Sequence, residues 1–266
     1  MICSLVGLNS GKFVRYHYEP PTLPPFVSLP ANRYFLGDSQ VSGHGVGNLT
    51  TNNWTAFNSM YITLGLGVTP NNTFNGVGGR GLYDTRLYHY GLWGASGAPR
   101  SGPEWVHFVE TGGQDEPGQL TATQFGDTFE AYCRWIKLRS PNCIISTETP
   151  FSFGREAEPG RDWTLYGVEQ AERIDILALD GIQVYLVDNN AGILALQNKL
   201  TPAQVWYQDG HPSEFHFTDL GNIMTGLLML KTFGHDIYSV DFTAILAQGN
   251  VTQSQIDKCY EVLNGV

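Results

Sequence analysis

Short apolar runs alternate along this chain with longer segments in which apolar residues recur at helical spacing. Runs of this kind are typical of strands buried in a sheet, and spacings of three and four residues are typical of helices with one buried face. Strands are expected at 34–36, 87–92, 105–109, 143–145 and 182–187. Helices are expected at 54–64, 122–138, 168–179, 191–198, 222–231 and 253–263. Strands that alternate with helices predict an α/β domain with a parallel sheet and right-handed crossovers.

The remaining segments suggest how the chain is organised. Five prolines between residues 20 and 30 disfavour regular structure, so residues 1–31 are expected to form an extended arm over the domain. Residues 32–235 carry the alternating pattern and form the predicted domain, and residues 236–266 are expected to add a helical extension. Residues 65–85 are rich in Gly and Asn and are expected to form a long loop.

Composition and charge narrow the classes of function. A 266-residue chain with 42% hydrophobic and 15% charged residues is typical of a globular protein. The formal net charge of −10 argues against a nucleic acid partner, because phosphate binding depends on Lys and Arg. No segment approaches the ~20 apolar residues of a membrane span, and residues 1–14 lack the basic region of a signal peptide. Scarce lysine and abundant Gly, Asn and Thr suit a secreted or virion-associated protein better than a cytoplasmic one.

The four cysteines show neither CxxC spacing nor the spacing of a metal site. Cys133 lies on the apolar side of a predicted helix and Cys143 begins a predicted strand, so both are expected to be buried thiols. A Cys133–Cys143 bridge and a Cys3–Cys259 bridge are alternatives to free thiols.

Four short polar motifs follow predicted strands or the helix beyond the last strand. They are Gly-Asp-Ser-Gln at 37–40, Trp-Gly-Ala-Ser-Gly at 93–97, Gly-Gly-Gln-Asp at 112–115 and Asp-Gly-His-Pro-Ser at 209–213. Because ligands bind at the carboxyl ends of the strands in an open parallel sheet, the motifs are expected to converge on one edge. A serine hydroxyl and an imidazole brought together there would form a nucleophile and its base.

The motifs, in this order, resemble those of the SGNH (GDSL-type) family of serine esterases and acyl hydrolases. The resemblance implies a three-layer α/β/α sandwich with a central five-stranded parallel sheet, the flavodoxin-like arrangement of that family, and an SGNH-type hydrolase domain at 32–235. It also implies Ser39 as nucleophile, His211 as base and Asp209 as the residue that orients His211. The oxyanion donors would be the backbone N–H groups of Ser39 and Gly97 and the side-chain amide of Gln114. No metal and no cofactor is implied.

The chain departs from the family pattern at two positions. Gln114 stands where the family has Asn, and so carries the same amide on one more methylene. Asp209 precedes His211 by two residues instead of three, so that a backbone carbonyl could orient His211 instead of Asp209. His216 is the alternative base, although Ser213, three residues before it, supplies no carboxylate. Taken alone, Ser39 could instead be a helix N-cap and Gly97 an ordinary turn.

The Asp-x-His-Pro-Ser form resembles that of carbohydrate esterases within the family. It implies hydrolysis of short acyl esters, acetyl first, on a small molecule or glycan, and Trp93, Trp206 and Tyr207 could stack on a sugar or could serve packing alone. The alternatives are a lipid esterase or lysophospholipase, and a glycan-binding module whose catalysis has decayed at Gln114. The glycine-rich segment 76–81 lacks the lysine of a P-loop, and no His, Cys and Glu set has zinc spacing.

Overall fold

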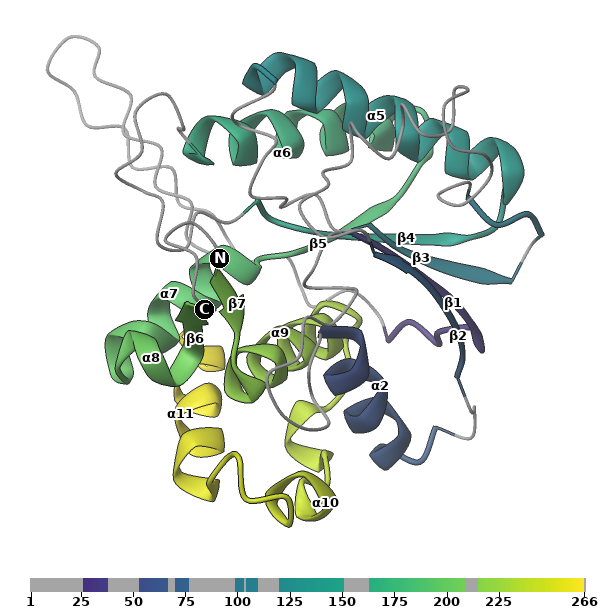
Figure 1. Cartoon of the computed structure of the whole chain (residues 1–266). Helices are drawn as coiled ribbons and strands as arrows, with labels where there is room; N and C mark the ends of the chain where they lie inside the picture. The colour runs from purple at the N-terminus through teal and green to yellow at the C-terminus, as the bar shows by residue number, and fades with distance from the viewer. Residues whose placement is uncertain are drawn as a thin grey trace, which may run out of the picture.

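The central element of the molecule is a parallel five-stranded sheet (Figure 1). The computed structural model describes residues 26–37, 53–66, 70–76, 99–102, 104–109, 120–150, 163–208 and 215–265. The strands are β1 (Asn32–Gly37), β2 (Asn71–Gly76), β3 (Trp105–Val109), β4 (Ile144–Glu148) and β5 (Val184–Val187). Their order is β2-β1-β3-β4-β5, which is the flavodoxin-like order. The predicted fold class is therefore confirmed.

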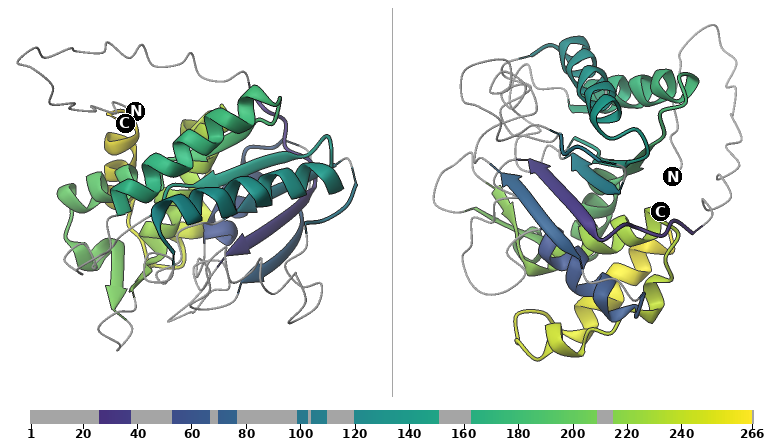
Figure 2. Two further views of the ribbon diagram at one scale, coloured as in Figure 1. Left: turned by 90° about the horizontal axis from the view of Figure 1, so that it is seen from above. Right: turned by 90° about the vertical axis from the view of Figure 1, so that its right-hand side faces the viewer.

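Helices cover both faces of this sheet and complete the three layers (Figures 1 and 2). The helices are α2 (Asn53–Thr63), α5 (Ala122–Arg139), α6 (Trp163–Leu179), α7 (Asn189–Lys199), α8 (Pro202–Val205), α9 (Asp219–Thr232), η2 (Ile237–Ser239), α10 (Thr243–Leu246) and α11 (Gln253–Leu263). Helices α5 and α6 pack together on one face, and α2 and α9 pack together on the other. A two-stranded antiparallel hairpin, β6 (Trp206–Gln208) and β7 (Phe215–Phe217), precedes α9.

Each face of the sheet has its own apolar core because successive side chains of a strand point to opposite faces. Tyr34 and Leu36 of β1 join the core beneath α5 and α6, whereas Phe35 joins the core beneath α2 and α9. Both faces are buried, as is usual for a parallel sheet. The Phe35 and Phe108 rings of neighbouring strands stack with centroids 4.4 Å apart.

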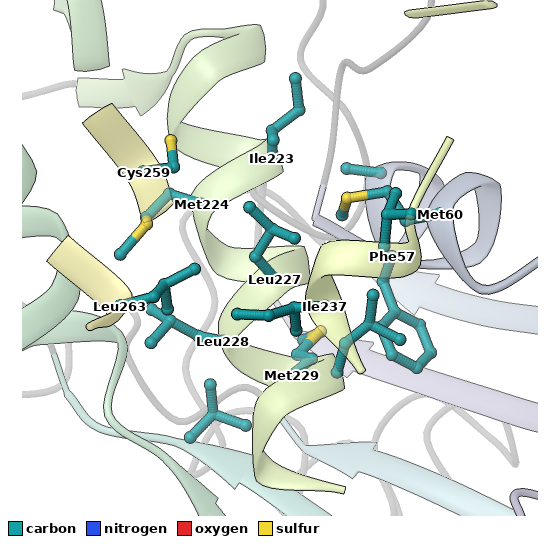
Figure 3. Packing of buried hydrophobic residues seen from close by; sticks show 14 of the residues in the cluster. Phe57, Met60, Ile223, Met224, Leu227, Leu228, Met229, Ile237, Cys259 and Leu263 are labelled. Carbon is teal, nitrogen blue, oxygen red and sulfur yellow. The ribbon is translucent and has the colours of Figure 1, made fainter. Parts of the chain in front are cut away.

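Helix α9 is buried on all sides and forms the centre of the larger core (Figure 3). All residues from Leu220 to Leu230 are buried, a pattern typical of a helix enclosed by other elements. A Cβ at Gly226 would lie 2.3 Å from Met60 Cε and 3.0 Å from the Phe57 backbone nitrogen of α2. Glycine at this position therefore allows α2 and α9 to approach closely.

The C-terminal residues contribute to the same core as α9. Ile256, Cys259, Val262 and Leu263 of α11 are buried in the cluster that contains α9 (Figure 3). A capping box starts α11, in which Thr252 and Gln255 each accept a hydrogen bond from the other's backbone N–H. At the other end of the chain, residues 26–31 contain no helix or strand, and the Val27 N–H donates to Phe233 O at 3.1 Å.

The second strand of the sheet differs from the sequence prediction. Strand β2 lies within residues 65–85, which were expected to form a loop, so that expectation is wrong at Asn71–Gly76. The expected strand at 87–92 lies outside the described residues. Strand β2 pairs with β1 along its whole length, Asn71 opposite Asn32 and Gly76 opposite Gly37, and within the described part of the chain no strand pairs with its other side. Backbone pairing to β1 therefore forms a strand from residues of low strand propensity.

The expectation of buried thiols is confirmed for Cys133 and Cys143, and Cys259 is a third buried thiol. Cys133, Cys143 and Cys259 are buried and free, and Cys3 lies outside the described residues. Burial raises the pKa of all three thiols. They are therefore unreactive core residues at neutral pH.

Candidate active site

The residues predicted to carry the chemistry all lie outside the described part of the chain. These are Ser39, Gly97, Gln114, Asp209 and His211. The structure does describe the strands that lead into several of these segments and the helices that hold those strands. The candidate site is therefore built from the positions of the strand ends.

Strands β1 and β3 end side by side at one edge of the sheet. Leu36 of β1 is the register partner of Val109, the last residue of β3. The chain leaves β1 at Gly37, two residues before Ser39, and leaves β3 at Val109, five residues before Gln114. In the order β2-β1-β3-β4-β5 the connections from β1 and β3 diverge at this point, and a ligand site is expected at such a switch point.

The β6–β7 hairpin carries the segment that contains Asp209 and His211. Strand β6 ends at Gln208 and β7 begins at Phe215, and these two residues pair across the hairpin. The hairpin lies on the side of the sheet to which the arrowheads of β1 and β2 point (Figure 2). The described ends of β1, β3 and the hairpin therefore face one region. His216, the alternative base, is placed by its backbone in β7, opposite Tyr207.

Close backbone contacts fix the hairpin against the start of α9. The Thr218 N–H donates to Val205 O at 3.0 Å, and the Thr218 hydroxyl donates to Gln204 O at 2.7 Å while accepting from the Gly221 N–H. A Cβ at Gly221 would lie 2.4 Å from Val205 O and 2.9 Å from Phe217 Cβ. Only glycine permits this approach. The start of α9 therefore contacts the hairpin at Val205, which precedes β6, and at Phe217, the last residue of β7.

A buried polar network supports the carboxyl ends of β4 and β5, and sequence reasoning did not identify it. The Asn189 amide at the start of α7 donates to Glu148 Oε2 of β4 at 2.8 Å. The Thr225 hydroxyl of α9 donates to Asn189 Oδ1 at 2.7 Å. Asn189 and Thr225 are fully buried, so these bonds tie β4, α7 and α9 together away from water.

A second set of bonds secures the same edge from the α6 side. The Gln170 amide of α6 donates to Thr147 Oγ1 at 3.1 Å and to Glu148 O at 3.0 Å. The Thr147 hydroxyl donates in turn to Val109 O, the last carbonyl of β3, at 2.8 Å. The point where the chain turns toward Gln114 is therefore held through β4 by α6. The polar residues 146–149, directly after the apolar Ile144 and Ile145 of β4, were the signal in the sequence.

Asp188 caps α7 next to this network. Its carboxylate accepts from the Ala191 N–H at 3.2 Å and from the Thr149 hydroxyl at 3.4 Å. Burial raises the pKa of Asp188 despite these donors. The Thr149 hydroxyl also accepts from the Asn190 N–H, which closes the turn between β5 and α7.

The described histidines with buried rings do not suit general base catalysis. His107 faces the core under α5, where its Nε2 accepts from the Arg100 N–H at 3.1 Å. Burial, with smaller effects of Arg100 and Lys137, lowers its pKa to about 4. Burial, followed by the charge of Arg33, also lowers the pKa of His235 to about 4. Both rings are neutral at pH 7.

The described part of the chain also bears on metal binding and membrane insertion. Among the described residues, no group of three or more His, Cys, Asp or Glu side chains is placed to hold a metal ion. In the same part of the chain, no helix combines the length and the apolar character needed to cross a bilayer.

Solved structures share this fold, although no protein-family model and no curated protein sequence matches the chain. A protein described as a GDSL-like lipase from Parabacteroides merdae matches with a TM-score of 0.60 and 17% identity, over 79% of this chain and 99% of that chain. An acetylxylan esterase from Geobacillus stearothermophilus matches with a TM-score of 0.55 and 15% identity, over 79% and 96%. A family 3 carbohydrate esterase from Clostridium thermocellum matches with a TM-score of 0.55 and 14% identity, over 76% and 94%.

The matches span nearly the whole of each solved chain and about four fifths of this one. Two structures of the acetylxylan esterase carry a substitution of a catalytic residue, in one case a serine and in the other an aspartate. At these identities the likeness establishes the fold alone.

Proposed function

We propose that this chain, which shares its fold with acetylxylan esterases and a GDSL-like lipase, is a serine esterase of the SGNH type. Its substrate is a short acyl ester, acetyl first, on a carbohydrate. The observation that carries the proposal is the common edge of the sheet to which β1, β3 and the β6–β7 hairpin lead. Each of these elements runs into a segment with the side chains that ester hydrolysis needs.

The first step would be attack by Ser39 Oγ on the ester carbonyl. The His211 imidazole takes the hydroxyl proton as the new C–O bond forms, because a serine hydroxyl is a poor nucleophile without a base. Asp209 orients the ring and stabilises the imidazolium. The oxyanion accepts hydrogen bonds from the Ser39 and Gly97 N–H groups and from the Gln114 amide.

The second half of the reaction releases both products. The imidazolium returns its proton to the sugar oxygen as the ester bond breaks, which leaves Ser39 acylated. A water molecule then attacks the acyl-serine while His211 takes one of its protons. The imidazolium returns this proton to Ser39 Oγ as the acyl–serine bond breaks and the carboxylic acid departs. The buried bonds of Glu148, Asn189 and Thr147 support the edge on which these groups are carried.

The related structures support the choice of substrate. Two of the three proteins compared above are described as acetylxylan or carbohydrate esterases. The Asp-Gly-His-Pro-Ser segment at 209–213 resembles the form found in carbohydrate esterases. A net charge of −10 also favours neutral substrates over anionic polymers.

Hydrolysis of p-nitrophenyl acetate by the wild type and by Ser39→Ala tests the reaction. We expect the wild type to turn over and the variant to lose at least about a thousandfold in kcat. A fluorophosphonate should label the wild type, and peptide mapping should place the label on Ser39. An inert, unlabelled wild type would favour the glycan-binding module whose catalysis has decayed, and a label on another serine would reject Ser39 as nucleophile.

A lipid esterase is the second candidate, because a GDSL-like lipase is among the structures with this fold. A series of p-nitrophenyl esters of increasing acyl length separates the two. We expect kcat/KM to be highest for acetate, and a maximum at about eight carbons or beyond would favour the lipid esterase.

A further inference from the structure

Arg33 is a buried cation at the amino end of β1, about 13 Å of strand away from the edge that carries the candidate active site. Its side chain is fully buried on the α2 face of the sheet. The guanidinium carbon lies 3.9 Å from the centre of the Tyr61 ring and 5.3 Å from that of Phe57. Both rings belong to α2, so this helix covers the charge.

The polar contacts of Arg33 leave most of its donors unpaired. Nη1 donates to Asn58 Oδ1, which is a neutral acceptor. Nε and Nη2 are buried and make no hydrogen bond of good geometry, and Nδ2 of the same Asn58 makes none either. The Tyr61 hydroxyl is a polar neighbour of the guanidinium that acts to raise the pKa of Arg33, against the larger effect of burial. Among the described residues no carboxylate forms an ion pair with Arg33. Three donor atoms on two touching side chains therefore share one buried region.

Two other polar groups border this region. Asn72 of β2 is the register partner of Arg33, so their side chains share a face of the sheet, and Asn72 Oδ1 is buried without a partner. The His235 ring packs edge-on against Tyr61 at 5.3 Å, and its Nε2 is also buried without a partner. His235 is neutral at pH 7, and its pKa is lowered to about 4 by burial and by the charge of Arg33. These neighbours add polarity without adding negative charge.

A buried cation without a counter-charge is unfavourable, because the interior replaces little of the hydration that the cation has in water. Burial lowers the pKa of Arg33 to about 10, so the guanidinium is still charged at pH 7. The unpaired side-chain atoms of Arg33 and Asn58 are all donors. A small anion satisfies both the charge and the unpaired N–H groups, whereas water satisfies only the latter.

We propose that Arg33 and Asn58, bordered by Asn72 and His235, form a buried binding site for a monovalent inorganic anion of halide size. The bound anion would accept from Arg33 Nε and Nη2 and from Asn58 Nδ2. It would thereby join the amino end of β1 to α2 and to the turn that follows α9. The site is independent of the esterase reaction, because it lies at the opposite end of β1.

Thermal unfolding in sodium bromide or chloride, balanced with sodium gluconate at constant ionic strength, tests the site. An anion that binds only the folded state raises the unfolding midpoint by about 3–5 °C for each tenfold increase above its dissociation constant. In Asn58→Asp the new carboxylate pairs with Arg33 in place of the anion. We therefore expect this variant to match or exceed the wild-type midpoint in gluconate and to lose the halide dependence.

Asn198→Asp is the matched control, because it adds the same charge on an exposed position of α7. It should keep the halide dependence of the wild type. Crystals grown in bromide should show an anomalous peak within hydrogen-bond distance of Arg33 Nε. If the wild-type unfolding midpoint does not respond to halide, the proposal is overturned in favour of bound water. A halide response of equal size in the wild type and in Asn58→Asp would also overturn it.

Discussion

Gln114 is the residue of the proposed oxyanion site at which the chain departs from the SGNH-type pattern that it resembles. If its amide stabilises the oxyanion, Gln114→Ala should lower kcat on p-nitrophenyl acetate by about 10²–10³-fold with little change in KM. The reason is that the hydrogen bond strengthens only as negative charge develops on the carbonyl oxygen. Steady-state kinetics of the purified variant provide the measurement.

Gln114→Asn is the companion variant, since it keeps the amide and removes one methylene. Activity between that of the wild type and that of Gln114→Ala would indicate that the length of the side chain matters as well as its amide group. Wild-type kcat in Gln114→Ala would show that the amide takes no part, and the oxyanion donors would then be backbone N–H groups alone.

His107 is a buried residue whose titration should make the stability of the protein depend on pH. Its pKa in the folded protein is about 4, mainly because of burial, whereas an unperturbed histidine titrates near 6.5. Between these values the unfolded chain binds more protons, so stability present above pH 6.5 is lost as the pH falls toward 4. At pH 5 the expected loss from His107 is about 2 kcal/mol.

Urea unfolding at pH 7 and pH 5 measures this effect. His107→Gln keeps an acceptor for the Arg100 N–H and removes the titration, so its loss of stability between the two pH values should be smaller by about 2 kcal/mol. His235 remains in the variant and retains its own share of the loss. Equal losses in wild type and variant would contradict the assignment, whatever their stability at pH 7.

At the scale of elements, the contact between the hairpin and α9 leads us to expect a clear effect of substitution at Gly221 on stability. Gly221→Ala places a methyl group 2.4 Å from Val205 O, so either the hairpin or the helix must move. We expect a loss of about 1–3 kcal/mol in the free energy of unfolding. If segment 209–214 carries the base, kcat should also fall at temperatures where the variant is fully folded.

Gly167→Ala on α6 is the control, because nothing lies within 4 Å of a Cβ at that position. Alanine is the better helix former by about 1 kcal/mol, so this variant should be as stable as the wild type or more so. Urea unfolding and p-nitrophenyl acetate hydrolysis of both variants make the comparison. Wild-type stability in Gly221→Ala would mean that the hairpin accommodates the methyl group without strain.

The elements also differ in how well sequence predicts them. Strands β1, β3, β4 and β5 were predictable because each contains at least two consecutive apolar residues, and α11 matched its prediction at both ends. Strand β2 has Phe74 as its only apolar residue, so its sequence favours a loop. The three-residue strands β6 and β7 are too short to show alternation. These elements form through pairing with a partner strand, which no local pattern records.

At the scale of the whole molecule, sequence indicated that the ends of β1 and β3 would share an edge but not what supports that edge. Glu148 and Asn189 are 41 residues apart, and Asn189 and Thr225 are 36 apart. They meet only because β4, α7 and α9 pack around one core. The side chains that border Arg33 likewise come from different elements, so their shared lack of partners becomes visible only in three dimensions.

The position of α11 predicts that the described chain unfolds as one unit. Ile256 is fully buried in the core that includes α9, so Ile256→Ala should cost about 2–5 kcal/mol and lower Tm by about 5–15 °C. Leu179, at the end of α6, is 88% exposed, so Leu179→Ala should change Tm little. Circular dichroism and tryptophan fluorescence should report the same single unfolding transition, and its midpoint should shift equally by both signals in Ile256→Ala. A shared core couples the stability of every element that contributes to it, so a single transition is expected. Two transitions, only one of which shifts in Ile256→Ala, would instead indicate that residues 236–266 form a separable extension.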